Sequence, residues 1–165
     1  MKKVFKFLFA FLATSSVLYV LISLFYSIRL PMIGTLSVAS TSNNILNTIG
    51  IKTLIVDDAI HLPGNVVLKI ILECTGLYEM IIFSAMVLSY PTNIKSKIYG
   101  IVSGIAIIYL LNMLRLVSIS WVLVYHIDKF DFVDRYLWQI SLVIFISITY
   151  TMWLKLIERS GSLSQ

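Results

Sequence analysis

The amino-acid sequence predicts an all-α integral membrane protein with about four transmembrane helices and a small extracytoplasmic helix and hairpin between the first and the second. Of the 165 residues, 59% are hydrophobic and 13% are charged, whereas soluble domains have about 45–50% apolar and about 25% charged residues. The apolar residues form long runs, and about 20 consecutive apolar residues are enough for a helix to cross a bilayer. We therefore expect a single membrane domain over residues 1–165.

Four apolar runs are the predicted spans. They cover about residues 4–28, 65–90, 98–125 and 135–156. A cleaved signal peptide is the alternative for the first run, but this run is longer than a typical signal-peptide core and no small-residue cleavage site follows it. In the third run, Gly100 and Gly104 have the spacing of small residues that let helices approach closely.

A more polar segment over residues 29–64 connects the first two runs. Residues 42–49 have the pattern of a short amphipathic helix that ends at Gly50. Residues 51–62 read as a small hairpin, and Pro63-Gly64 closes it. We therefore expect an ordered outer segment rather than a flexible linker.

Basic residues predict the orientation in the membrane. With four spans, both termini and the 91–97 loop share one side, which carries Lys2, Lys3, Lys6, Lys95, Lys97, Lys155 and Arg159. The other side carries Arg29, Lys52 and Lys129 together with Asp57, Asp58, Asp128, Asp131 and Asp134. Because positive residues favour the cytoplasmic side, both termini are expected in the cytoplasm. Segments 29–64 and 126–134 then face outward from the cell membrane.

Several functional classes lack their sequence signatures. The single cysteine, Cys74, excludes an internal disulfide, a CxxC redox pair and a cysteine-rich metal site. His61 and His126 are far apart and have no ligand spacing around them. No nucleotide-binding, zinc-protease or nucleic-acid-binding pattern is present. We therefore predict no cofactor, no metal and no nucleic acid.

A polar cluster interrupts the second apolar run at Glu73-Cys74-Thr75-Gly76. Such groups are costly in a bilayer and usually serve a function. If a helix enters the membrane at Asn65, Cys74 lies roughly 13 Å below the outer surface. Arg115, counted back from the outer end of the third span, lies roughly 16 Å deep. The thiol and the guanidinium are therefore expected at similar depth.

This pairing suits nucleophilic chemistry. A thiolate is the reactive form of cysteine, and burial alone disfavours it. Arg115 keeps its proton, so it is a poor base but a good partner for a thiolate or an oxyanion. Glu73 is the candidate counter-ion of Arg115, and His126 is a candidate for acid–base work because its ordinary pKa is near neutral.

Three short segments resemble, in order, the boxes of the exosortase/archaeosortase family of membrane cysteine transpeptidases. Glu73-Cys74-Thr75-Gly76-Leu77 is similar to its Cys-Ser/Thr-Gly box and Asn112-Met-Leu-Arg115 to its Asn-x-x-Arg box. Phe132-Val-Asp134-Arg135 matches the last box, which usually carries a His or an Arg near the start of the final span. The resemblance covers about residues 45–152, and the four-span core is like that of the short archaeal-type members.

The resemblance implies a membrane-embedded cysteine transpeptidase that acts on the outer side. Its substrates would be exported surface proteins that end in a short motif, a transmembrane helix and a basic cluster, and its acceptor could be a membrane lipid. The catalytic residues would be Cys74, Arg115 and Arg135, with His126 as the alternative third residue. Glu73, Thr75, Gly76 and Asn112 would support them.

Two other classes fit parts of the pattern. In a non-enzymatic membrane scaffold or assembly subunit, Cys74 would be a packing residue and Arg115–Glu73 a structural ion pair. In a transporter subunit, the stripe of Asn112, Arg115 and Ser118 would line a pathway. The absence of paired, interrupted apolar segments argues against the transporter.

Overall fold

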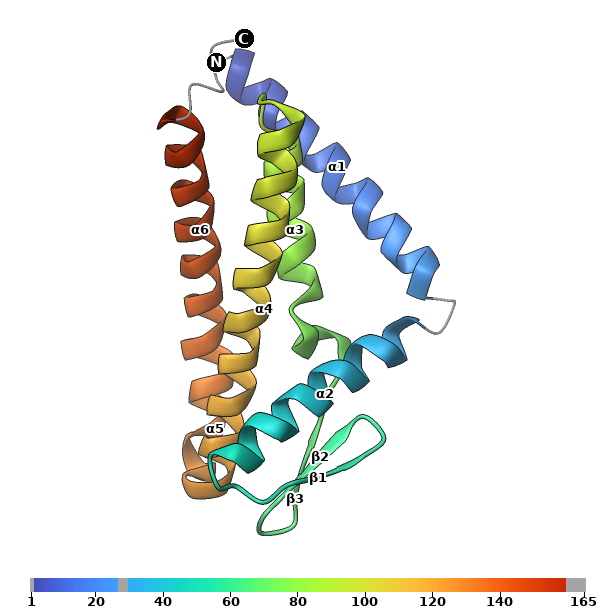
Figure 1. Cartoon of the computed structure of the whole chain (residues 1–165), viewed down its shortest axis with the longest axis vertical. Coiled ribbons are helices and arrows are strands. Elements are labelled where there is room, and N and C mark those ends of the chain that lie inside the picture. The colour runs from blue at the N-terminus through green and yellow to red at the C-terminus, as the bar shows by residue number, and fades with distance from the viewer. Residues whose placement is uncertain (1, 27–29, 160–165) are drawn as a thin grey trace. The chain divides into compact units, whose positions relative to one another are not determined.

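The computed structural model describes residues 2–26 and 30–159, and its main elements are helices (Figure 1). The elements in chain order are α1 (Lys2–Tyr26), α2 (Leu30–Thr48), β1 (Leu54–Val56), β2 (Ala59–Leu62), β3 (Val66–Lys69), η1 (Leu72–Thr75), α3 (Leu77–Ser89), α4 (Ile94–Tyr125), η2 (Ile127–Lys129), α5 (Phe130–Phe132), η3 (Val133–Trp138) and α6 (Gln139–Arg159). The end of the predicted first span at Ile28, Arg29 and residues 160–165 of the tail lie outside the described residues.

Two long helices are apolar enough to cross a membrane. They cover Ile94–Tyr125 and Ile127–Arg159, which contain the predicted third and fourth spans over 98–125 and 135–156. Residues 127–134, expected as a loop between these spans, are helical as well. Phe5–Val20 within α1 and Leu77–Ser89 are shorter apolar helices. The protein is thus a helical membrane protein, while the number of four spans and their orientation stay predictions.

The predicted helix over residues 65–90 is wrong for residues 65–76. Val66–Lys69 form strand β3, and α3 begins only at Leu77. Gly64 and Asn65 have φ angles of +82° and +61°, so the chain reverses there and β3 returns beside β2. A short apolar run fits a strand as well as a helix, and the antiparallel partner decides between them here. The helical depth count for Cys74 therefore does not hold.

Residues 51–62 form the predicted hairpin, and one further strand follows it. β1 pairs antiparallel with β2, and β2 pairs antiparallel with β3, so the sheet order is β1-β2-β3. The short helix predicted over 42–49 is the end of the longer helix α2, which packs against the sheet (Figure 1). Asn47 Oδ1 accepts a 3.0 Å hydrogen bond from the Thr53 amide and so connects α2 to the approach of β1.

The chain divides into two compact units, and the single-domain prediction is not tested by this division. One unit comprises residues 1–28, 78–108 and 144–165, and the other comprises residues 29–77 and 109–143. In the first, Gly104 faces the ring of Phe83 and Gly100 faces the indole of Trp153, which leave no space for a Cβ. The close helix contact predicted at these glycines is confirmed.

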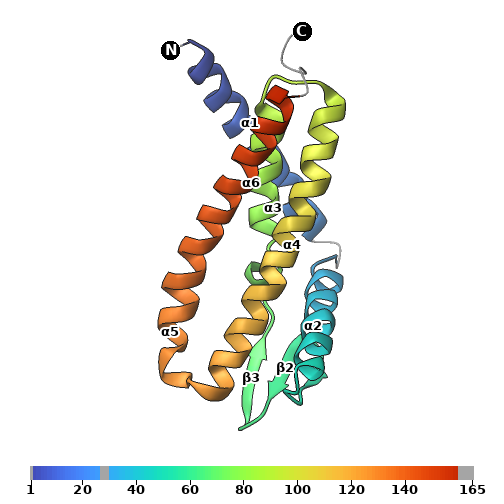
Figure 2. The same cartoon turned by 60° about the vertical axis from the view of Figure 1, so that its left-hand side comes forward.

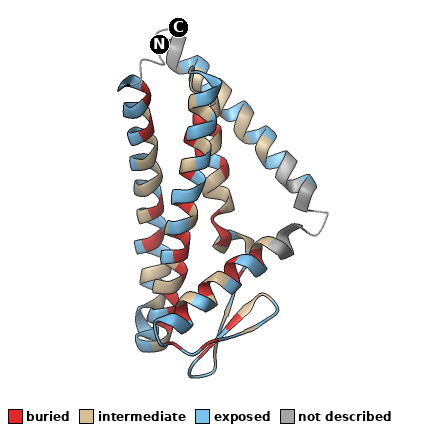
Figure 3. Cartoon of the chain, viewed as in Figure 1, coloured by how far each residue is buried: buried red, intermediate tan, exposed pale blue. Residues whose placement is uncertain are grey.

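The second unit has its own apolar core. Buried residues recur along α2 and α4 (Figure 3). The core is formed by Val38, Ala39, Leu46, Ile51, Ile60, Leu62, Ile70, Met113, Leu116, Ile119, Leu123 and Trp138. Because α2, the sheet and the second half of α4 share this core, the turn that follows β3 is held beside α4.

Candidate functional site

Cys74 lies on a tight turn between β3 and α3. The turn is η1, a 3-10 helix over Leu72–Thr75 that begins after the extended Ile71. The Cys74 amide donates a 2.9 Å hydrogen bond to the Ile71 carbonyl, and the Thr75 hydroxyl donates a 2.6 Å bond to the Leu72 carbonyl. Glu73 is exposed, whereas Cys74 is half-buried and Thr75 is buried. The cysteine is thus presented by a short turn and not from within a helix.

Gly76 ends this turn in a conformation that favours glycine. Its φ angle is +75°, a left-handed value that costs other residues energy. A Cβ at this position would lie 3.2 Å from Asn112 Cβ and Cγ. Gly76 therefore provides both the backbone geometry and the space that bring the cysteine turn against α4.

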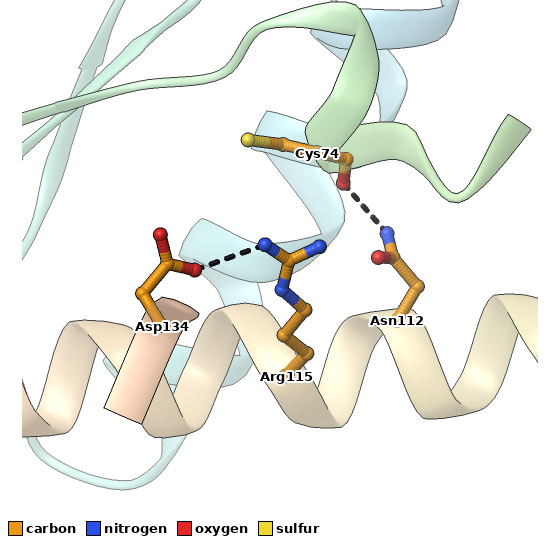
Figure 4. Close-up of polar contacts among 4 residues, drawn as sticks. All are labelled: Cys74, Asn112, Arg115 and Asp134. Atoms are coloured by element: carbon orange, nitrogen blue, oxygen red, sulfur yellow. Dashed lines mark hydrogen bonds and ion pairs between the residues drawn. The ribbon is translucent and has the colours of Figure 1, made fainter. Parts of the chain in front are cut away.

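Asn112 holds the Cys74 turn from α4. Its Nδ2 donates a 2.7 Å hydrogen bond to the Cys74 carbonyl (Figure 4), and the residue is buried. This bond joins the turn of Cys74 to the helix that carries Arg115. Asn112 Oδ1 is also buried and has no partner among the described residues.

Arg115 lies one turn further along α4 and pairs with Asp134. Arg115 Nη2 is 2.9 Å from Asp134 Oδ1, and the two side chains are 16% and 31% exposed. The expected counter-ion Glu73 is exposed on η1, so Asp134 takes that place. Arg115 Nε is buried without a partner in the described part of the chain. Figure 4 shows Arg115, Asp134 and Asn112 gathered on one side of the cysteine turn.

The charges around the thiol act in opposite directions. The turn lies outside the two helices that are long enough to span. Burial raises the pKa of the Cys74 thiol, and the carboxylates of Asp134 and Glu73 raise it further. The Ile71 backbone hydrogen bond and the Arg115 guanidinium lower this pKa but do not offset burial. Arg115 thus has the predicted sign of effect, while the net effect of all these groups is to raise the pKa of the thiol.

The two candidates for the third position are exposed. Arg135 Nη2 is 3.8 Å from Asp131 Oδ1, with both side chains about three-quarters exposed at 74% and 77%. The His126 ring packs at 5.5 Å from the Trp121 ring at the end of α4. Within the described residues, neither side chain has a hydrogen bond or an ion pair that connects it to Cys74. Ser118 bonds to the Leu114 carbonyl of its own helix.

Asp134 is the site residue that the sequence did not single out. It lies with Arg135 in η3 (Val133–Trp138), where the helix widens to π geometry. Such wide turns are often found at functional sites. An acid directly before the last family-like position was the available signal, but its partner is 19 residues away in sequence. No group of three or more potential metal ligands is found among the described residues.

Residues 1–154 match the model of the family described as Transmembrane exosortase (Exosortase_EpsH). The chain belongs to this family. No match was found in the comparisons with curated proteins and with solved structures. Membership supports a membrane transpeptidase or protease of the exosortase type, which implies the processing of C-terminal sorting signals on exported proteins.

Proposed function

We propose that this exosortase cleaves the C-terminal sorting signals of surface proteins through a Cys74 thioester and transfers the new carboxyl end to an acceptor. The observation that carries the proposal is the Asn112 bond to the Cys74 carbonyl, because it holds the only thiol of the chain beside the Arg115–Asp134 pair. Acyl transfer uses a nucleophile and a fixed donor that stabilises the oxyanion, and Cys74 and Arg115 supply these two groups from separate elements.

The first step exchanges one acyl bond for another. Cys74 Sγ attacks the carbonyl carbon of the scissile peptide, the carbon–sulfur bond forms and the carbon–nitrogen bond breaks. The thiol proton ends on the amine of the departing C-terminal segment. In the second step, an amine of the acceptor attacks the thioester carbon, a new carbon–nitrogen bond forms and the carbon–sulfur bond breaks. The proton lost by the amine returns to the Cys74 sulfur. A lipid-linked amine is the acceptor class we propose.

Arg115 stabilises negative charge in both steps. A guanidinium keeps its charge at all working pH values, and a fixed donor beside the reacting carbonyl stabilises the oxyanion. Asp134 orients this guanidinium by the 2.9 Å ion pair. The unpartnered Arg115 Nε and Asn112 Oδ1 provide one donor and one acceptor for the substrate backbone.

Arg135 is the proposed third residue, with His126 as the alternative. Arg135 follows Asp134 directly in η3, so a rotation of this wide turn would bring it toward the substrate. We place the reaction on the extracytoplasmic side of the cell membrane, with both termini in the cytoplasm, because of the distribution of basic residues.

Replacing the thiol tests the proposal. In cells that produce a tagged surface protein with a C-terminal motif, helix and basic cluster, Cys74→Ala and Cys74→Ser should leave the full-length precursor in the membrane. The wild type should release the C-terminal tail of the surface protein. Hydroxylamine should cleave the thioester that wild-type Cys74 forms with the substrate. Normal processing in a well-expressed Cys74→Ala variant would reject the mechanism.

A non-enzymatic scaffold is the second candidate, and two observations favour it. Burial raises the pKa of Cys74, as in an inert packing cysteine, and Arg115 already has an ion-pair partner. Under this hypothesis, Cys74→Ala would retain all cellular functions of the protein. Accumulation of precursor in that variant separates the two candidates.

A further inference from the structure

Strand β3 forms a free edge of the sheet. It lies at the end of the order β1-β2-β3, and Ile60 faces Leu68 in its pairing with β2. The Ile70 amide donates a 2.9 Å hydrogen bond to the Asp58 carbonyl. Because antiparallel partners alternate along a strand, Leu68 and Ile70 direct their backbone groups to β2, whereas Val67 and Lys69 direct theirs away from it.

The outward groups are available. In the described part of the chain, no backbone hydrogen bond joins Val67 or Lys69 to a group outside the sheet. Val67 is 52% exposed, and Ile71, which follows two residues after Lys69, is 48% exposed. Free strand edges of this kind accept an added strand.

The edge leads directly to the candidate nucleophile. Strand β3 is labelled in Figure 2. It ends at Lys69, and Cys74 follows after Ile70, Ile71 and the beginning of η1. The chain path from Lys69 to Cys74 is roughly 13 Å at the rise of a strand and then of a 3-10 helix. A peptide of a few residues paired with β3 would therefore reach the thiol.

We propose that the free edge of β3 binds the extended segment of the substrate as a fourth strand and delivers its scissile bond to Cys74. The inference rests on the proposed function. Because β3 runs along the chain toward Cys74 and the scissile bond follows the bound segment of the substrate, the added strand is parallel to β3. Val67 and Lys69 supply backbone donors and acceptors, which bind the substrate backbone independently of the substrate's side chains.

Proline at the outward position removes the donor without breaking the pairing with β2. Val67→Pro should lower the initial rate of precursor processing about tenfold, since one backbone hydrogen bond and its neighbours are lost. Ile55→Pro is the matched control, because Val56 pairs with Ala59 and Leu54 with His61, which leaves Ile55 facing outward on the opposite edge.

The readout is cleavage of the tagged precursor, with thermal unfolding and Cys74 alkylation measured on the same full-length variants in detergent. Equal processing rates for folded Val67→Pro and folded Ile55→Pro would overturn the inference. If the wild type still processes the precursor, that result leaves the proposed function unaffected. Failure of the wild type to process the precursor would instead reject the function and the inference together.

A scan on the substrate keeps the inference testable if Val67→Pro does not fold. Proline placed at successive positions before the cleavage point should block processing at every second position, because alternate residues of a strand face the partner edge. Uniform tolerance of proline would overturn the inference. A wild-type dimer that Val67→Pro converts to a monomer would show that the edge binds a second copy, which also overturns it.

Discussion

Gly76 and Gly104 serve different purposes in the two units of the chain. Gly104 faces the apolar ring of Phe83, and the surrounding core of its unit is built from buried apolar side chains. Gly76 has a positive φ angle and faces Asn112, whose remaining oxygen is buried without a partner in the described residues.

The difference separates a packing contact from a contact at the proposed site. Around Gly104, close approach buries apolar surface and leaves little for a ligand to bind. Around Gly76, close approach brings together a thiol, an amide and an ion pair. Arg115 Nε and Asn112 Oδ1 are buried here without a partner in the described residues. Such atoms are costly to bury, and under our proposal the substrate satisfies them.

Removing the Arg115 guanidinium should have the largest effect on the processing rate. Arg115→Gln is expected to lower the initial processing rate about a hundredfold, since a fixed donor to the oxyanion is lost. Arg115→Lys keeps the charge without the planar fork and should give an intermediate rate. Arg159→Gln, at the exposed end of α6, is the control and should process normally. A wild-type rate in Arg115→Gln would mean that the Arg115–Asp134 ion pair has only a structural role.

Alanine substitutions at Gly104 and Gly76 should separate an effect on the free energy of unfolding from an effect on the processing rate. Gly104→Ala is expected to lower the free energy of unfolding by about 1–3 kcal/mol, because the added carbon overpacks the core at Phe83. Gly76→Ala should cost about 1–2 kcal/mol through its left-handed backbone and should slow processing as well, because the turn of Cys74 must shift from Asn112. Denaturant unfolding and processing rates in detergent measure both.

The matched control is a second substitution that makes space. Phe83→Leu in the Gly104→Ala background should recover part of the lost stability. If Gly104→Ala slowed processing more than Gly76→Ala at equal amounts of folded protein, the distinction between a packing role for Gly104 and a site role for Gly76 would be wrong.

The pH dependence of thiol alkylation should show the smallest effects. Because burial raises the pKa of Cys74, the midpoint of labelling should lie above that of an ordinary cysteine. Asp134→Asn removes a charge that raises this pKa, so the midpoint should move to lower pH. Glu73→Gln should move it in the same direction by less, since its contribution is the smaller one.

Asp128→Asn is a suitable control, because Asp128 has no part in the shift of Cys74. Its midpoint should equal that of the wild type. An upward shift in Asp134→Asn would mean that this carboxylate acts mainly by holding Arg115 near the thiol, and not through its own charge.

The long helices, and the polar segments that stand out within apolar runs, could be predicted from the sequence. The lengths of the apolar runs were enough to locate Ile94–Tyr125 and Ile127–Arg159. Asn112 and Arg115 recur on one face of α4 because a helix repeats every 3.6 residues. The polar Glu73–Gly76 segment stood out against its apolar surroundings, and Asn112 does contact it.

Strand β3 and the partner of Arg115 required the tertiary structure. Val66–Lys69 are apolar enough for either a helix or a strand, and pairing with β2 selects the strand. Glu73 is nearer to Cys74 in sequence, yet Asp134 reaches Arg115 from another helix. Local composition and periodicity determine which segments become helices and which polar residues stand out. Which strand edge stays free, and which carboxylate pairs with a cation, depend on contacts between segments distant in sequence.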